Sequence, residues 1–397
     1  MFTLPIILGA GLLCRSAIAA PLSPEDAVSH ALSIHPQLRT SEANLQVALA
    51  AHTRAAAPRY NPTLSAQAAL SGDRLGLSLA QPLSLTGVRR AQRLQTRAAL
   101  DAATADLERT RRVVAAEARS AYVEATVTAA VARLARDSVQ LSEQLESAAR
   151  LRYAEGEASL LDLRLTRLSL ARSASWLLDA SARESIALQG LSAMLGQPVA
   201  IEDLTAALAQ VAPLPGGTSP ANRSDVVAAE ARTQAAELDL RQQRAAAIAP
   251  VSVGMFIQRE DASTFVGPSV GWELPLFARN QLAQAEAQAD VWTAQAAQTS
   301  TTTRAISEIA TSTARHAEAE ALVAGLGADL SMEADEALDG IAFSYQAGHT
   351  DLLSTLILQS EVLSGQAALI ALEGQLADAR LALLLAQDDD ALLGGVR

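Results

Sequence analysis

The sequence predicts an exported, mainly α-helical protein with a β-barrel portion, built from two copies of one structural unit. Three observations predict this class. The chain starts with a short apolar segment of the kind that export removes. It contains stretches without proline or glycine that are too long for globular helices, and two short regions in which apolar and polar residues alternate.

The composition favours closely packed helices over a thick aromatic core. Half of the 397 residues are hydrophobic but only 3% are aromatic, so the apolar content is largely alanine and leucine. The net charge is −12, and every basic side chain other than histidine is an arginine. An acidic chain with few aromatics lacks the basic face that nucleic acid requires, which excludes that class of partner.

Residues 1–20 are predicted to be a signal peptide. Phe2–Leu13 has the length of an apolar signal core, and Ala17-Ile18-Ala19 offers small residues for cleavage. Cys14 then belongs to the removed peptide, although its lipidation stays open. The mature chain would have no cysteine, which excludes disulfides and thiolate metal sites. No later run of 18 apolar residues predicts a transmembrane helix.

The mature chain looks duplicated. Residues 153–163 align with 345–355 at an offset of 192, and Pro82 aligns with Pro275 at an offset of 193. Each unit would contain a helix, a β-hairpin and a pair of long helices. The predicted segments are a first repeat 21–197 (helix 36–57, hairpin 62–81, helices 88–152 and 158–195), a linker 198–222, a second repeat 223–388 (helix 223–249, hairpin 250–274, helices 278–347 and 350–387) and a tail 389–397.

The alternating regions predict strands of about 8–10 residues, close to the length that a tilted strand needs to cross a bilayer. Pro82 and Pro275 are expected to end the second strand of each hairpin and to mark the passage into the long helices. Four such strands cannot close a barrel, because a small barrel needs about eight and lipid does not tolerate open edges. Several chains must therefore contribute strands to one barrel.

The motifs of this chain resemble those of the TolC family of outer-membrane efflux proteins. The resemblance rests on the duplication, on the strand-proline-helix passages and on the Tyr-x-x-Gly-x-x-x-Leu-Leu turns. Met194-Leu195-Gly196, which closes a return helix, adds to it. LPLFARNQ (274–281) resembles most closely the cobalt–zinc–cadmium, or heavy-metal, branch.

The resemblance implies a homotrimer with a 12-stranded outer-membrane β-barrel, four strands per chain, above a periplasmic α-helical barrel. It implies docking to a periplasmic adaptor protein and to an inner-membrane pump of the resistance–nodulation–division type. The chain would then be an exit duct in the outer membrane of a Gram-negative bacterium and would catalyse no reaction itself. Divalent heavy-metal cations would be its cargo, with drugs or a type I secretion substrate as the alternative within the family.

The predicted functional residues lie at the two helical turns. The first interpretation of each Tyr-x-x-Gly is a helix–helix turn in which glycine takes a positive φ. The resemblance adds contact with the adaptor and a pore gate, in which Tyr345 bonds Asp162 and holds a closed state. The tip residues are Tyr153, Gly156, Asp162, Tyr345, Gly348 and Asp351.

Other candidates have simpler interpretations. His349 is predicted to be an exposed tip residue, since no second histidine lies at metal-ligand spacing. Asp388-Asp389-Asp390 is expected to be a solvated charge run. No motif predicts a catalytic, cofactor-binding or metal site, so the chain is not expected to be an enzyme. The competing class is an exported structural coiled-coil protein without a channel, which would have no need of four membrane-length strands.

Overall fold

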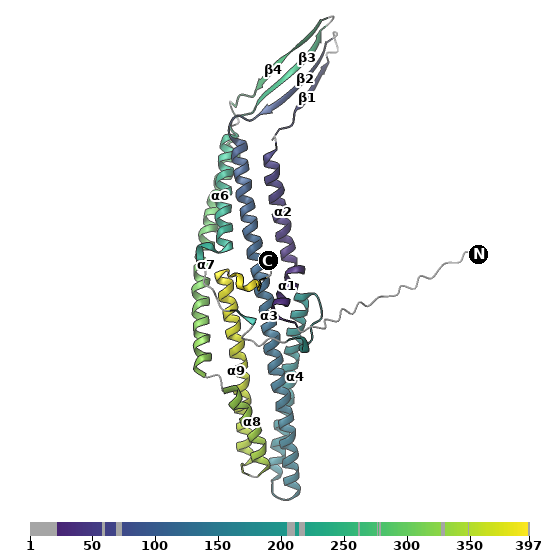
Figure 1. Cartoon of the computed structure of the whole chain (residues 1–397), viewed down its shortest axis with the longest axis vertical. Coiled ribbons are helices and arrows are strands. Elements are labelled where there is room, and N and C mark those ends of the chain that lie inside the picture. The colour runs from purple at the N-terminus through teal and green to yellow at the C-terminus, as the bar shows by residue number, and fades with distance from the viewer. Residues whose placement is uncertain are drawn as a thin grey trace, which may run out of the picture.

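The computed structural model of the chain is a long rod of helices with a small β-sheet at one end (Figure 1). It confirms the prediction of a mainly helical chain with four strands. The predicted signal segment, with Cys14, lies outside the described residues, which are 22–57, 60–68, 74–204, 211–213, 219–260, 263–275, 277, 279–326, 330–347 and 349–395. The elements are α1 (Pro24–Ile34), α2 (Pro36–Ala56), β1 (Thr63–Ala68), β2 (Arg74–Leu83), α3 (Val88–Ala154), α4 (Leu160–Leu195), η1 (Ile201–Asp203), η2 (Pro220–Asn222), α6 (Ser224–Ala245), β3 (Val251–Glu260), β4 (Ser263–Trp272), α7 (Gln281–Leu326), α8 (Leu330–Gln346), α9 (Leu352–Gln387) and η3 (Asp390–Leu393).

Helix α3 runs the length of the helical rod. It has 67 residues, which at about 1.5 Å per residue gives roughly 100 Å. It starts directly after Gly87, whose φ of 68° lets the chain turn out of the sheet. The stretch predicted as one helix, 278–347, is described as two helices, α7 and α8. Alanines dominate the buried face of α3 and let neighbouring helices lie close: Ala98, Ala102, Ala115, Ala116, Ala118, Ala125, Ala132, Ala135 and Ala149.

Helix α1 was not predicted from the sequence. Its start is a capping box, in which Ser23 Oγ accepts from the Asp26 N–H at 3.1 Å and the Asp26 carboxylate accepts from the Ser23 N–H at 3.3 Å. Pro24 occupies the first helical position, where no N–H is needed. Helix α2 follows at once, because Pro36 removes an N–H that a continuous helix would use.

The four strands form one antiparallel sheet in the order β1-β2-β3-β4. Each hairpin pairs its own strands, and β2 pairs with β3 along ten residues, from Arg74 opposite Glu260 to Leu83 opposite Val251. The two hairpins, far apart in sequence, therefore make a single surface. Strands β1 and β4 are its two free edges.

The two prolines differ in position. Pro82 lies inside β2, one residue before its end, and faces Ser252 of β3. Strand β1 pairs only as far as Ala80, so β2 has a neighbour on one side alone at Pro82, which is where a residue without an N–H can sit. Pro275 lies three residues beyond the end of β4 at Trp272.

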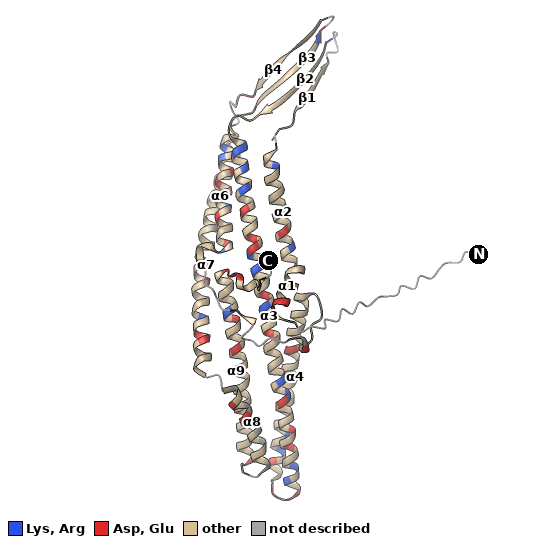
Figure 2. Ribbon diagram, in the orientation of Figure 1, with Lys and Arg blue, Asp and Glu red and all other residues tan. Residues whose placement is uncertain are grey.

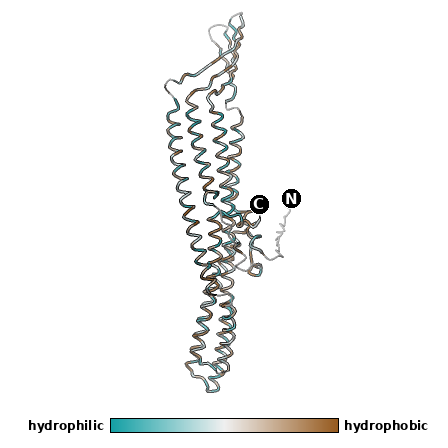
Figure 3. Tube along the Cα trace, turned by 60° about the vertical axis from the view of Figure 1, so that its left-hand side comes forward, coloured by the Kyte–Doolittle hydropathy of each residue, from teal (hydrophilic) through white to brown (hydrophobic). Residues whose placement is uncertain are grey.

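The main hydrophobic core lies at the middle of the rod rather than along it. It joins α1, α3, the end of α4, the end of α9 and η3. Val211 and Ala212, from the predicted linker, are buried in it. In two views the C-terminal end of the chain lies beside this part of the rod (Figures 1 and 3). The division into two repeats stays a prediction, and these two residues of the predicted linker are part of the core.

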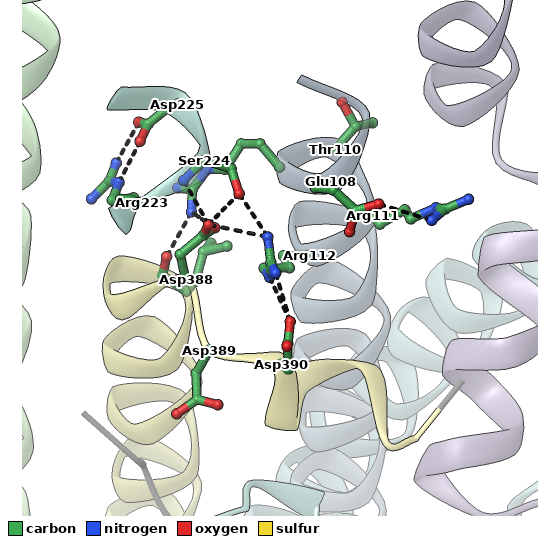
Figure 4. Close-up of polar contacts among 12 residues, drawn as sticks. Glu108, Thr110, Arg111, Arg112, Arg223, Ser224, Asp225, Asp388, Asp389 and Asp390 are labelled. Atoms are coloured by element: carbon green, nitrogen blue, oxygen red, sulfur yellow. Dashed lines mark hydrogen bonds and ion pairs between the residues drawn. The ribbon is translucent and has the colours of Figure 1, made fainter. Parts of the chain in front are cut away.

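A network of buried polar contacts, which we call the waist, surrounds Asp388 at the end of α9 (Figure 4). The Asp388 carboxylate accepts from Arg109 at 3.0 Å, from Arg112 at 3.1 Å and from the Ser224 N–H at 2.7 Å. Arg112 also donates to Asp390 at 2.6 Å. One carboxylate thus links α3, the start of α6 and the end of α9.

Two more arginines belong to the waist. Arg223 donates to Asp225 and Glu308, and also to the Ala386 carbonyl at 3.2 Å. Arg119, only 1% exposed, donates to the Leu392 carbonyl at 3.0 Å and to the Val211 carbonyl at 2.7 Å. The guanidinium therefore adds two hydrogen bonds to the apolar packing of η3 and Val211 against α3.

The interpretation of Asp388-Asp389-Asp390 as a solvated charge run was wrong for Asp388, whereas the Asp390 side chain is 80% exposed. Asp388 is 7% exposed, and Asp389 accepts from the Ala391 N–H at 2.9 Å to start η3. Burial alone raises the pKa of Asp388, but the hydrogen bonds from Ser224 and the charges of Arg112 and Arg109 outweigh burial and hold the pKa below its usual value. Asp388 is therefore ionised and structural at neutral pH.

We expect Asp388→Ala to lower the free energy of unfolding by about 3–5 kcal/mol, because it leaves the largely buried Arg109 without its carboxylate and Arg112 with Asp390 alone. Asp101→Ala removes an exposed pair with Arg97 and should cost less than about 1 kcal/mol. Urea unfolding of the purified chains measures both.

The pH dependence follows from the lowered pKa of Asp388. A lowered pKa adds stability above the unfolded value and loses it as the pH falls through the folded value. The gap between wild type and Asp388→Ala should therefore be full at pH 7 and shrink in acid below about pH 4. A gap that does not change with pH would contradict an ionised Asp388.

Candidate functional site

The first candidate site is the turn between α3 and α4 at the far end of the rod. Gly156 has a φ of 82°, and its N–H donates to the Tyr153 carbonyl at 3.1 Å. The Glu157 N–H donates to the Arg152 carbonyl at 2.8 Å. These bonds satisfy the last carbonyls of α3, so the glycine reverses the helix as a C-terminal cap. Tyr153 is 43% exposed and free to contact a partner.

Asp162 fixes the start of α4. Its backbone N–H donates to Ser159 Oγ at 3.1 Å, and its carboxylate accepts from the Ser159 N–H at 2.9 Å. This reciprocal pair is a capping box. The negative charge also lies at the N-terminal end of a helix, where the helix dipole favours it.

The second turn joins α8 to α9. Asp351 caps α9 by accepting from the Ser354 N–H at 3.2 Å, and hydrogen bonds from Ser354 lower its pKa. The His349 N–H donates to the Ser344 carbonyl at 2.9 Å, and the His349 side chain is exposed. Gly348 lies outside the described residues.

Tyr345 is the anchor between the two turns. It is 2% exposed and packs in one cluster with Leu145 of α3 and Leu352 of α9. The Arg152 guanidinium carbon lies 5.3 Å from the centre of its ring, and Arg152 Nη1 donates to the Tyr345 carbonyl at 3.4 Å. The helix pair α3–α4 thus contacts the helix pair α8–α9 through one aromatic ring.

The predicted bond between Tyr345 and Asp162 stays a prediction. The two residues are close enough for the Asp162 charge to act on the phenol. Burial raises the pKa of Tyr345, the Arg152 charge opposes this, and the Asp162 charge raises the pKa further. The carboxylate itself is occupied by Ser159. A phenol kept neutral is able to donate a hydrogen bond.

Arg152 was missed in the sequence analysis. The sequence feature that could have indicated it is its place in the last turn of α3. The helix end stabilises a cation there, and a cation can also pack on an aromatic ring. That neighbour lies 193 residues away in the chain, and only the fold brings the two together.

The second candidate site is the sheet, which has one apolar and one polar face. Directly opposed residues share a face, so Leu77 lies with Ala66 and Ile257, and Ile257 lies with Val266. The apolar face consists of Leu64, Ala66, Ala68, Leu75, Leu77, Leu79, Leu83, Val251, Val253, Met255, Ile257, Val266, Pro268, Val270 and Trp272, with Gln81, Arg259 and Thr264 toward its ends.

The other face is small and polar apart from two phenylalanines. Ser78 lies opposite Ser65 on one side and Phe256 on the other, and Gly254 lies opposite Ser269. Most of the large apolar side chains are exposed, including Leu79, Met255 and Val270. In water such an apolar face needs a covering, and an exposed patch of this kind marks contact with lipid or protein.

No helix among the described residues is both long and apolar enough to cross a membrane. The same part of the chain has no group of three or more histidine, aspartate or glutamate side chains that could hold a metal ion. The predicted tip residues are brought together as two adjacent turns, except for Gly348, which is not described.

Comparisons with known proteins agree with this architecture. The fold is that of the outer-membrane channel OprN (TM-score 0.72, 22% identity, 94% of this chain and 90% of that chain). It is also that of VceC from Vibrio cholerae (0.73, 21%, 92% and 96%) and of CusC (0.71, 18%, 92% and 91%), whose structures report transmembrane channel formation. At these identities the likeness establishes the fold.

Part of the sequence also matches a known family. Residues 27–197 match the model of the family described as outer membrane efflux protein. No curated protein matches the chain in sequence. The family model covers less than half of the chain, and the solved structures extend the likeness of fold over nearly all of it. Neither comparison distinguishes a heavy-metal branch.

We expect Tyr345→Ala to destabilise the junction of the two turns by about 3–5 kcal/mol, because it removes a buried ring. Tyr345→Phe keeps the packing and loses only the hydroxyl, so its cost should be near 1 kcal/mol. Limited proteolysis at the exposed arginines of α4 compares the variants. Equal protection of Tyr345→Ala and wild type would show that the ring does not join the hairpins.

Proposed function

We propose that this chain is one subunit of the outer-membrane exit duct of a tripartite efflux system. The observation that carries the proposal is the sheet: four strands with one apolar and one polar face, two free edges, and a roughly 100 Å helical rod below. The apolar face suits lipid and the polar face suits a water-filled lumen. The sheet would lie in the outer membrane of a Gram-negative bacterium, with the helices in the periplasm.

The free edges of β1 and β4 support an oligomer. In lipid, every backbone N–H and C=O must be paired, so the edges need strands from other copies. Three copies would give a barrel of twelve strands. Each copy also exposes apolar side chains on helix surfaces that a neighbour would cover: Leu161, Leu168, Leu178 and Ile186 on α4, and Leu322, Leu326, Met332 and Phe343 on α7 and α8.

The proposed role of the tip follows from its exposure and its cross-links. Tyr153 is available to a periplasmic adaptor, which would connect the duct to an inner-membrane pump of the resistance–nodulation–division type. Tyr345, held by Arg152, would keep the two hairpins of a subunit together and the pore narrow. On this proposal Tyr345→Ala also raises the conductance of the channel in a planar bilayer. Unchanged conductance would count against a gate at this ring.

The proposed cargo is divalent heavy-metal cations. Its support is the resemblance of residues 274–281 to the heavy-metal branch. A duct of this kind needs no tight metal site, since tight binding would slow release. Export of drugs or of a secreted protein is the alternative within the same architecture.

The duct predicts a trimer in the outer-membrane fraction. The band should migrate as a trimer in unheated gel samples and as a monomer after boiling, as membrane β-barrels unfold only with heat. The matched control is a chain without residues 63–83 and 251–272, which should leave the membrane fraction. A soluble periplasmic monomer as the wild-type form would sink the duct and favour a structural coiled-coil protein.

The cargo is tested by deleting the gene in its own host. Growth inhibition should occur at lower concentrations of zinc, cobalt or cadmium salts, and susceptibility to hydrophobic drugs should change little. Complementation with the wild-type chain restores resistance. Drug sensitivity with normal metal tolerance would replace metal ions by organic compounds as the cargo.

A further inference from the structure

The apolar face of the sheet carries one charged residue among the strand residues that the structure describes. Arg259 is the next-to-last residue of β3. The other two charged residues of the described strands, Arg74 and Glu260, lie on the opposite face at the same level. Arg74 starts β2, and Arg259 and Glu260 end β3, so all three lie at one end of the sheet, the end that Figure 2 shows far from the helices. A cation on an apolar surface requires an explanation, because it loses hydration there.

The two arginines have different surroundings. Arg74 forms an ion pair with Glu260, its direct neighbour across β2 and β3. Arg259 lies between Leu75 on one side and Thr264 on the other, and its side chain is exposed. Within the described ranges, 22–57 through 349–395, no carboxylate pairs with Arg259. On a face that contacts lipid, its guanidinium would therefore need a counter-charge from outside these residues.

A groove starts beside this arginine. Its volume is about 410 Å³, and Arg259 and Thr264 line it at one end. Ala66 and Ala68 are small residues set among the larger Leu77 and Ile257, so the surface is hollowed there. The groove lies across the four strands over two neighbouring register levels, and its lining is mainly apolar. A guanidinium with a neighbouring hydroxyl stands at its outer end.

The level of Arg259 fits the boundary of a bilayer. Strands of ten residues rise about 33 Å, close to the roughly 30 Å hydrocarbon thickness. A residue next to the strand end then lies near the headgroups, where an arginine on the lipid face is tolerated. Its guanidinium suits phosphate, because it presents two N–H groups to two oxygens.

We propose that Arg259, Thr264 and the groove bind one anionic membrane lipid, with the headgroup phosphate on Arg259 and an acyl chain over Ala66 and Ile257. The inference rests on the proposed function, since it requires the apolar face to contact the bilayer. Thr264 would donate a second hydrogen bond to the phosphate. The site would fix the level of each subunit in the membrane.

The test is lipid retention by the purified full-length trimer in nonionic detergent. Native mass spectrometry counts dioleoyl-phosphatidylglycerol bound per subunit during titration, with dioleoyl-phosphatidylcholine and inorganic phosphate as comparisons. Wild type should retain one phosphatidylglycerol per chain. Arg259→Gln should bind it about tenfold more weakly, the loss of one charge-assisted hydrogen bond. Arg259→Lys should retain most of the binding.

Two further variants separate charge from groove. Arg74→Gln, at the same level on the other face, should bind like wild type. Ala66→Leu fills the hollow and should weaken lipid retention with Arg259 intact. Equal retention by wild type and Arg259→Gln, an equal loss in Arg74→Gln, or full competition by inorganic phosphate would each overturn the site.

Failure of the site and failure of the duct are distinguishable. If Arg259→Gln binds lipid like wild type but still forms heat-sensitive trimers in the outer membrane, only the lipid site is wrong. If wild type fractionates as a soluble monomer, the duct itself is wrong, whatever the lipid counts in detergent are.

Discussion

One ionised carboxylate, buried where three helices meet, holds the middle of this molecule together. Asp388 ends α9 in a left-handed turn and receives hydrogen bonds from α3 and from the first residue of α6. Long helices with alanine seams bury little surface per residue, so packing alone leaves their relative level weakly defined. The fixed donors of Arg109 and Arg112 supply that definition, because a shift by one turn would strand a buried charge.

The two ends of the rod obey different constraints. At the sheet, the alternation of apolar and polar side chains matters more than which residue stands at each position. In lipid, the unpaired edges would also need strands from another source. At the tip, specific contacts matter, since Tyr345 is the ring on which Leu145, Leu352 and Arg152 converge. The waist lies between these two ends and belongs to neither repeat alone, because Arg109 and Asp388, which it joins, are 279 positions apart.

What could be predicted from the sequence was local. The hairpins followed from period-two alternation, and the turn at Gly156 from a glycine in an unbroken helical stretch. The start of α1 was also local, and the capping box of Ser23 and Asp26 would have revealed it. The burial of Asp388 was not visible, because three consecutive aspartates at a chain end are usually solvated. The role of Arg152 was not visible either, because the ring that it covers comes from the other half of the chain.

The continuity of α3 makes the molecule a lever with unequal arms. From Arg112, about 24 residues lead to the sheet end and about 42 to the tip, or roughly 36 Å and 63 Å. A tilt of about 5° around the waist would move the sheet end by roughly 3 Å and the tip by roughly 5 Å, for a straight rod of these lengths. On the proposed function, a tilt would therefore move the membrane end less than the tip. The barrel would stay sealed while the passage at the tip changes its width.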